Sequence, residues 1–125
     1  EALLKGVEYI LPGGITFLDK DGHKRDAVRT QWWINEDSLL GDVAFPLGVL
    51  DGKTGQHKIS ASELVGYPVE CKPVFLGHYW FKGEPKRLAP NVACLDYSVA
   101  KGGKLVAYRW SREQVLSNDN FVFAP

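Results

Sequence analysis

The sequence of 125 residues has no methionine, only two cysteines and no excess of charge of either sign. Fifteen Lys and Arg residues balance fifteen Asp and Glu residues, so no net charge attracts nucleic acid or an acidic membrane. No apolar run approaches the ~20 residues that cross a bilayer, and the basic start of a signal peptide is missing. These absences predict a cytoplasmic protein without a membrane or nucleic-acid partner.

The rare residues also bear on the extent of the chain. Cys71 and Cys94 are too few for a disulfide framework, which favours two reduced thiols. Because methionine is absent and the first residue is Glu1, we expect the chain to begin inside a longer protein. Its length suits one domain with a hydrophobic core better than two. We therefore expect a single domain over residues 1–125, in three sections: 1–34, 35–72 and 73–125.

The first section reads as strands joined by glycine turns. A helix end followed by a strand is expected over residues 1–11, and a hairpin after it. The hairpin has a strand at Ile15–Leu18, a turn at Asp19–His23 with an Asp-Gly pair, and a return strand at Ala27–Ile34. Alternation along the return strand places Arg29 and Trp33 on one face. That face either binds a ligand or holds a cation–π pair on a solvated sheet, and the second is the commoner outcome.

The middle section, residues 35–72, is rich in Gly and Pro and reads as loops. Residues 35–38 are expected to cap a short helix over Leu39 and Leu40. Residues 58–65 are expected to hold one helical turn, with Ser60 and Glu63 spaced as a capping box. A loop-rich stretch of this length is usually a lid, a binding loop or a disordered segment.

The last section predicts strands at residues 73–77, 92–97 and 105–110, with a further one at 121–123. Residues 82–90 read as a polar loop, and residues 101–104 as a glycine turn. The expected fold class is therefore α+β with β dominant, built from antiparallel hairpins.

The Gly77-His78 pair, which follows an apolar run, is the clearest candidate for chemistry. Neutral imidazole is a common ligand of zinc, manganese and iron, although a lone histidine is more often satisfied by a backbone carbonyl. His23, Asp19 and Asp21 read as turn residues, and His57 has no partner in sequence. Asp96 interrupts an apolar strand, so it should be paired or lie near a polar site.

The run from Pro73 to Trp110 resembles the C-terminal part of calcineurin-like metallophosphoesterases, of the bacterial serine/threonine-phosphatase-like or diadenosine-tetraphosphatase-like subgroup. The resemblance rests on Gly77-His78-Tyr79-Trp80, on Leu95-Asp96 and on Gly102-Gly103-Lys104-Leu105. It implies the C-terminal part of a β-sandwich. It also implies a parent enzyme that hydrolyses phosphate esters or anhydrides with a water activated by two divalent metals (Mn, Fe, Zn or Ni). His78 would bind one metal, and Asp96 would orient a ligand or a loop.

The chain also departs from that family. Its members take most metal ligands from an earlier set of motifs, Asp-x-His, Gly-Asp-x-x-Asp and Gly-Asn-His-Glu, and this set is not complete here. We therefore expect the isolated chain to hold no metals and to be inactive. The expected partners are the missing N-terminal part and a phosphorylated small molecule, dinucleotide or phosphoprotein, and exposed strand edges could also pair copies of the chain. The alternatives are a non-catalytic binding or accessory domain that uses the face of Arg29 and Trp33, and a purely structural fragment.

Overall fold

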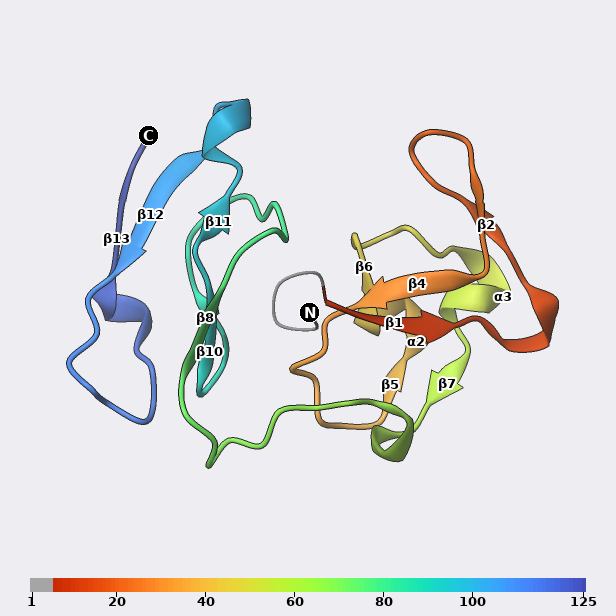
Figure 1. Ribbon diagram of the computed structural model, residues 1–125, viewed down its shortest axis with the longest axis horizontal. Helices are drawn as coiled ribbons and strands as arrows, with labels where there is room; N and C mark the ends of the chain where they lie inside the picture. Colours follow the sequence, from red (N-terminus) through yellow and green to blue (C-terminus); the bar gives the residue numbers. More distant parts are fainter. Residues whose placement is uncertain (1–5) are drawn as a thin grey trace. The chain divides into compact units, whose positions relative to one another are not determined.

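The computed structural model describes residues 6–125, which form two compact units, one up to Tyr67 and the other Pro68–Pro125. Both units consist of short, mostly antiparallel strands with single turns of helix between them (Figure 1). The β-dominant fold class expected from the sequence is confirmed. The helix end expected at the start of the chain falls largely on residues 1–5, outside the described residues.

Unit 1 is built around a three-stranded sheet of order β1-β4-β6, in which both pairs are antiparallel. The sheet comprises β1 (Val7–Ile10), β4 (Ala27–Thr30) and β6 (Ala44–Phe45). Unit 1 also has two smaller antiparallel pairs: β2 (Phe17–Leu18) with β3 (Lys24–Arg25), between β1 and β4 in sequence, and β5 (Ser38–Leu39) with β7 (Lys58–Ile59), on either side of β6. The helical turns are η1 (Pro12–Gly14), α2 (Leu40–Val43), α3 (Gly52–Gly55) and η2 (Ala61–Glu63).

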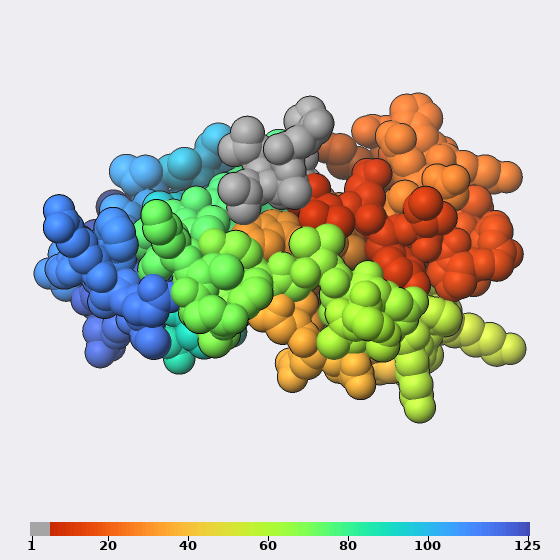
Figure 2. Space-filling model, turned by 60° about the horizontal axis from the view of Figure 1, so that its bottom comes forward, coloured from red at the N-terminus to blue at the C-terminus, as the bar shows by residue number. Residues whose placement is uncertain are grey.

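The expected hairpin forms, but with a different return strand. The strand after the Asp19–His23 turn is β3, whereas Ala27–Thr30 pairs with β1 and β6. The prediction of one return strand over 27–34 is therefore wrong: β4 ends at Thr30, and Trp32 and Trp33 lie in the turn that follows. Figure 2 shows the tip of the β2–β3 hairpin, in orange, standing out from the body of unit 1.

The section read as loops supplies most of the core of unit 1. Leu40, Val43 and Ala44 are fully buried, and Ile59 is nearly so. Leu11, Val28 and Leu50 complete this cluster. The capping box of Ser60 and Glu63 is confirmed around η2. The helix cap expected from residues 35–38 is wrong, because Ser38 and Leu39 form β5 and α2 starts without a side-chain cap.

Unit 2 contains two three-stranded sheets. In the first, of order β8-β10-β9, β10 (Val92–Cys94) runs parallel to β8 (Val74–Leu76) and antiparallel to β9 (Arg87–Ala89). In the second, of order β11-β12-β13, β12 (Lys104–Tyr108) lies between β11 (Asp96–Tyr97) and β13 (Phe121–Ala124), and both pairs are antiparallel. The remaining turns are η3 (Val99–Lys101) and η4 (Asn118–Asn120).

Most of the expected strands of unit 2 are present. The strand expected at 92–97 is divided at Leu95 into β10 and β11, which belong to different sheets. The loop expected over 82–90 contains β9. Both sheets contribute to one buried cluster, which consists of Ala93 from β10 together with Tyr97, Val106, Leu116 and Phe121. Within residues 6–125, no helix is long and apolar enough to cross a membrane.

Candidate functional site

His78 lies just beyond β8 and has an exposed side chain. The apolar run before it forms the strand, and Leu76 is buried. The backbone of His78 is left-handed, with φ of 66°, and Trp80 has φ of 52°. Such a conformation costs a non-glycine residue about 1–2 kcal/mol, so the surrounding structure must hold it in place.

Two groups hold this turn. Asp96 accepts a hydrogen bond from the Trp80 backbone N–H at Oδ2, 3.3 Å away, and one from the Ser98 N–H at Oδ1, 3.1 Å away. Tyr79 is fully buried, and its ring stacks on that of Phe81 with centroids 6.1 Å apart. A buried anchor between two exposed residues fixes the direction in which His78 and Trp80 leave the surface. Asp96 thus contacts the turn that carries His78, although its predicted role beside a metal stays a prediction.

His78 does not stand in a cluster of metal ligands. Among residues 6–125, no group of three or more His, Cys, Asp or Glu side chains is placed to hold a metal ion. A single imidazole can give a metal one of its ligands but cannot fix a coordination geometry by itself. Within the described part of the chain, this turn therefore presents one candidate metal ligand, the exposed imidazole of His78.

The turn residues Asp19, Asp21 and His23 behave as expected for a hairpin. Asp21 and His23 also have the spacing of an Asp-x-His motif. However, the Asp19 carboxylate accepts hydrogen bonds from both of their backbone N–H groups, each 2.9 Å long, and from Arg25 Nε at 2.8 Å. The bond from the His23 N–H, followed by that from Arg25, lowers the pKa of Asp19 from 3.8 to about 2. These three residues serve the turn.

The shared face of Arg29 and Trp33 is not formed. Trp33 lies beyond the end of β4 and is 4% exposed, with its ring edge-on to Trp32. The Arg29 guanidinium lies 5.6 Å from the centroid of the Phe45 ring, so its cation–π partner is Phe45, which pairs with it across β4 and β6. Trp33 does not follow the predicted alternation because β4 stops at Thr30, and period two applies only within a strand.

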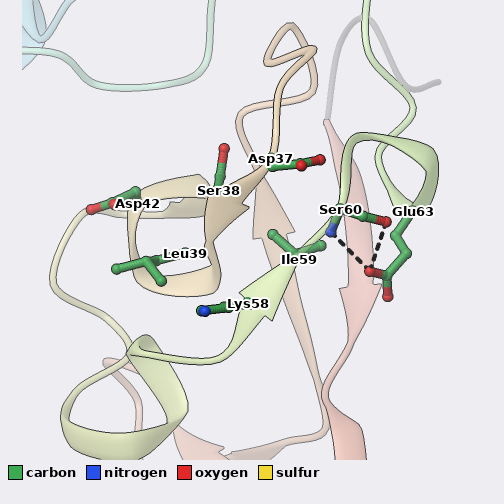
Figure 3. Close-up of a pocket in the computed structure, with 8 residues that line it drawn as sticks. All are labelled: Asp37, Ser38, Leu39, Asp42, Lys58, Ile59, Ser60 and Glu63. Atoms are coloured by element: carbon green, nitrogen blue, oxygen red, sulfur yellow. Dashed lines mark hydrogen bonds between the residues drawn. The ribbon is translucent and has the colours of Figure 1, made fainter.

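Unit 1 contains a hollow of about 540 Å³ (Figure 3). Its polar groups are mostly used by the fold. Glu63 accepts hydrogen bonds from the backbone N–H and the hydroxyl of Ser60, and Asp37 accepts one from the Ala61 N–H, 2.8 Å long. The hydrogen bonds from the backbone N–H and the hydroxyl of Ser60 lower the pKa of Glu63 below its ordinary value. The lining residues are Asp37, Ser38, Leu39, Asp42, Lys58, Ile59, Ser60 and Glu63.

Sequence reasoning missed a contact made by Trp80, two residues beyond His78. Trp80 is 42% exposed, and the Lys101 ammonium lies 4.4 Å from the centroid of one of its rings. Lys101 comes from η3, whose tight turn was expected from the Gly102-Gly103 pair, but nothing in the sequence pairs that turn with Trp80. Comparison of the chain with protein-family models, curated proteins and solved structures gives no match.

Proposed function

We propose that this chain is the C-terminal section of a calcineurin-like metallophosphoesterase and that it contributes one metal ligand, His78. The observation that carries the proposal is the exposed imidazole at the end of β8, on a left-handed turn that the Asp96 carboxylate and the buried Tyr79 hold. A rigidly placed ligand of this kind suits a metal centre, because loosely held ligands bind metals poorly. The β-sandwich is part of this proposal, as is a cytoplasmic location, where thiols stay reduced.

The residues described here do not fit a complete two-metal centre, since no cluster of three ligands is present among them. The remaining ligands, and the activated water, belong to the proposed N-terminal part of the parent. This chain supplies one imidazole, that of His78, on a turn that fixes its direction. On this proposal the 125-residue chain alone hydrolyses no phosphate ester.

The test is hydrolysis of p-nitrophenyl phosphate with Mn²⁺ by the longer protein that contains this chain. His78→Ala should lower kcat/KM by at least about 100-fold, as expected when a metal ligand is lost. The matched control is His57→Ala, which also removes an imidazole but lies in unit 1, outside the proposed site. It should leave kcat/KM unchanged. Full activity in His78→Ala, or His78-dependent turnover by the 125-residue chain, would overturn the proposal.

A second candidate is a non-catalytic binding domain. The observation that favours it is a hollow of about 440 Å³ in unit 1, where Arg29 and Phe45 stand beside Phe17 and Arg25. Trp33, being buried, takes no part in that surface. The sequence upstream of Glu1 discriminates: metal-binding motifs there support the phosphoesterase, and an unrelated domain supports the binding module.

A further inference from the structure

We propose that unit 2 carries a binding site for a phosphate-bearing small molecule, in a hollow of about 420 Å³ beside η3. Three lysines line this hollow: Lys82, Lys101 and Lys104. Its volume lies within the range of small-molecule sites, roughly 300–1,000 Å³. That three cations surround one hollow indicates a compact anion rather than an extended polymer, which needs a basic stripe.

The aromatic rings of unit 2 hold two of the three ammonium groups in position. Lys101 Nζ lies 4.4 Å from the centroid of the Trp80 ring, and Lys104 Nζ lies 4.2 Å from that of Phe123. A cation on a ring face is restrained on that side, while its other N–H donors are left for a ligand. Both lysines therefore lose less side-chain freedom on binding than lysines that extend into water.

The charge around the hollow remains positive. Lys104 Nζ pairs with Glu84 Oε1 at 2.7 Å, and Glu84 is the only carboxylate in a salt bridge with these lysines within residues 6–125. Lys82 and Lys101 make no ion pair in that part of the chain. Pro125 also lines the hollow, and its carboxylate ends the 125-residue chain, so the three ammonium groups outnumber the two carboxylates by one. Lysine binds a phosphate as a point charge.

Two glycines form part of the wall of the hollow. Gly102 has φ of 79°, and a Cβ there would meet nothing within 4 Å. A Cβ at Gly103 would overlap the carbonyl oxygen of Tyr97 and lie 2.8 Å from that of Ser98. Gly103 therefore lets the turn close, whereas the open space beside Gly102 lets a ligand approach the backbone there. The N–H groups of both glycines are bonded to Val99 and Ser98 carbonyls, so recognition falls to the lysines.

The position of the hollow connects it with His78. Lys101 lies on the ring of Trp80, two residues beyond His78, and Ser98, which lines the hollow, shares the Asp96 carboxylate with Trp80. The assignment of this anion as the phosphate of a substrate rests on the proposed function. Binding of the anion to the hollow does not.

Binding is tested with inorganic pyrophosphate, titrated into the ¹⁵N-labelled 125-residue chain at an ionic strength of about 0.15 M. Shifts are expected at the amides of Ser98, Gly102 and Gly103. The double variant Lys82→Gln/Lys101→Gln should raise Kd by about tenfold or more, and Lys101→Arg should preserve binding because it keeps the charge. Lys53→Gln, in α3 of unit 1, is the matched control and should bind as the wild type does.

Shifts spread evenly over the chain, or an equal loss of affinity in Lys53→Gln, would show general charge attraction and overturn the proposal, as would unchanged binding by the double variant. The two proposals fail separately. If pyrophosphate binds but His78→Ala keeps full activity in the longer protein, the phosphoesterase proposal is refuted and the anion site in the hollow is not. The opposite result is also possible: His78→Ala loses activity, pyrophosphate causes no shifts, and the double lysine variant keeps the KM of the wild type. That result would refute the anion site in the hollow and leave the phosphoesterase proposal standing.

Discussion

Asp96 places its two carboxylate oxygens on backbone N–H groups, one in the turn after β8 and one at Ser98. In the turn after β2, Asp19 Oδ1 accepts two backbone N–H groups, and its Oδ2 accepts the Arg25 side chain. The Asp19 carboxylate stabilises the backbone of a hairpin turn, and the Asp96 carboxylate stabilises the left-handed backbone of Trp80 and Ser98. The difference lies in what the turn presents, since the turn of Asp96 carries the exposed His78.

Replacement of Asp96 by Ala should destabilise unit 2. It removes the acceptor of two backbone hydrogen bonds beside left-handed Trp80 and Ser98, which costs about 1–3 kcal/mol where the site excludes water. Urea denaturation measures this change. Asp119→Ala, at an exposed carboxylate of the same unit, is the control and should change the free energy of unfolding by less than about 0.5 kcal/mol. Equal effects of the two variants would contradict the role given to Asp96.

The β2–β3 turn should depend on acid pH through Asp19. Its pKa falls from 3.8 to about 2 on folding, so the carboxylate favours the folded turn above pH 3.8. That stabilisation is lost as the pH falls from about 4 towards about 2. Amide shifts of His23, followed by NMR during acid titration, should report this low midpoint. Asp19→Asn should abolish the transition, whereas a midpoint near 4 in the wild type would contradict the hydrogen bonds described.

At the scale of elements, η3 and the glycine pair that follows it determine the turn between β11 and β12. Ser98 enters η3 with φ of 61°, and its carbonyl accepts N–H groups of both Lys101 and Gly103. The chain folds back so closely that position 103 has no room for a side chain. This turn forms one wall of the lysine-lined hollow.

Gly103→Ala should therefore destabilise unit 2 by about 1–3 kcal/mol, because its Cβ would meet backbone oxygens of Tyr97 and Ser98 that cannot move freely. Thermal unfolding followed by circular dichroism measures the loss. Gly77→Ala is the control: its Cβ would lie 3.9 Å from that of Asp96, an ordinary contact, and the change should be small. A melting temperature unchanged in Gly103→Ala would show that the turn can relax.

Elements with strong local signals were predicted from the sequence, and elements fixed by distant partners were not. The Asp-Gly turn, the capping box of η2 and strands β8, β12 and β13 follow from local residue patterns. The strands of residues 35–72 were not predicted because each has only two residues, too few for any periodicity. The same section nevertheless contains the core residues Leu40 and Ile59. Likewise, His78 was found from Gly-His at a strand end, whereas the Lys101–Trp80 contact joins residues 21 positions apart.

At the scale of the whole molecule, β13 forms an edge of its sheet. It pairs with β12 on one side and is the last strand in the order β11-β12-β13. Residues 121–124 carry no charge, and Val122 and Phe123 are 41% and 46% exposed. Edge strands without charged residues readily pair with other strands. Since the net charge is zero, no long-range repulsion keeps copies apart.

We therefore expect the 125-residue chain to self-associate through β13. Sedimentation equilibrium should show a dimer that Val122→Lys weakens by about tenfold or more, because a charge on an edge strand opposes pairing. Val115→Lys adds the same charge at an exposed loop residue and should leave the association unchanged. A wild-type chain that stays monomeric at high concentration would contradict this expectation.

In the proposed function, His78 is a ligand that this chain gives to a metal centre completed by other residues. The most direct measurement is the metal content of the purified longer protein, determined by mass spectrometry after dialysis against Mn²⁺-free buffer. We expect about two metal ions per chain in the wild type and in His57→Ala, and a loss of about one in His78→Ala. Two ions retained in His78→Ala, or no metal in the wild type, would contradict the account.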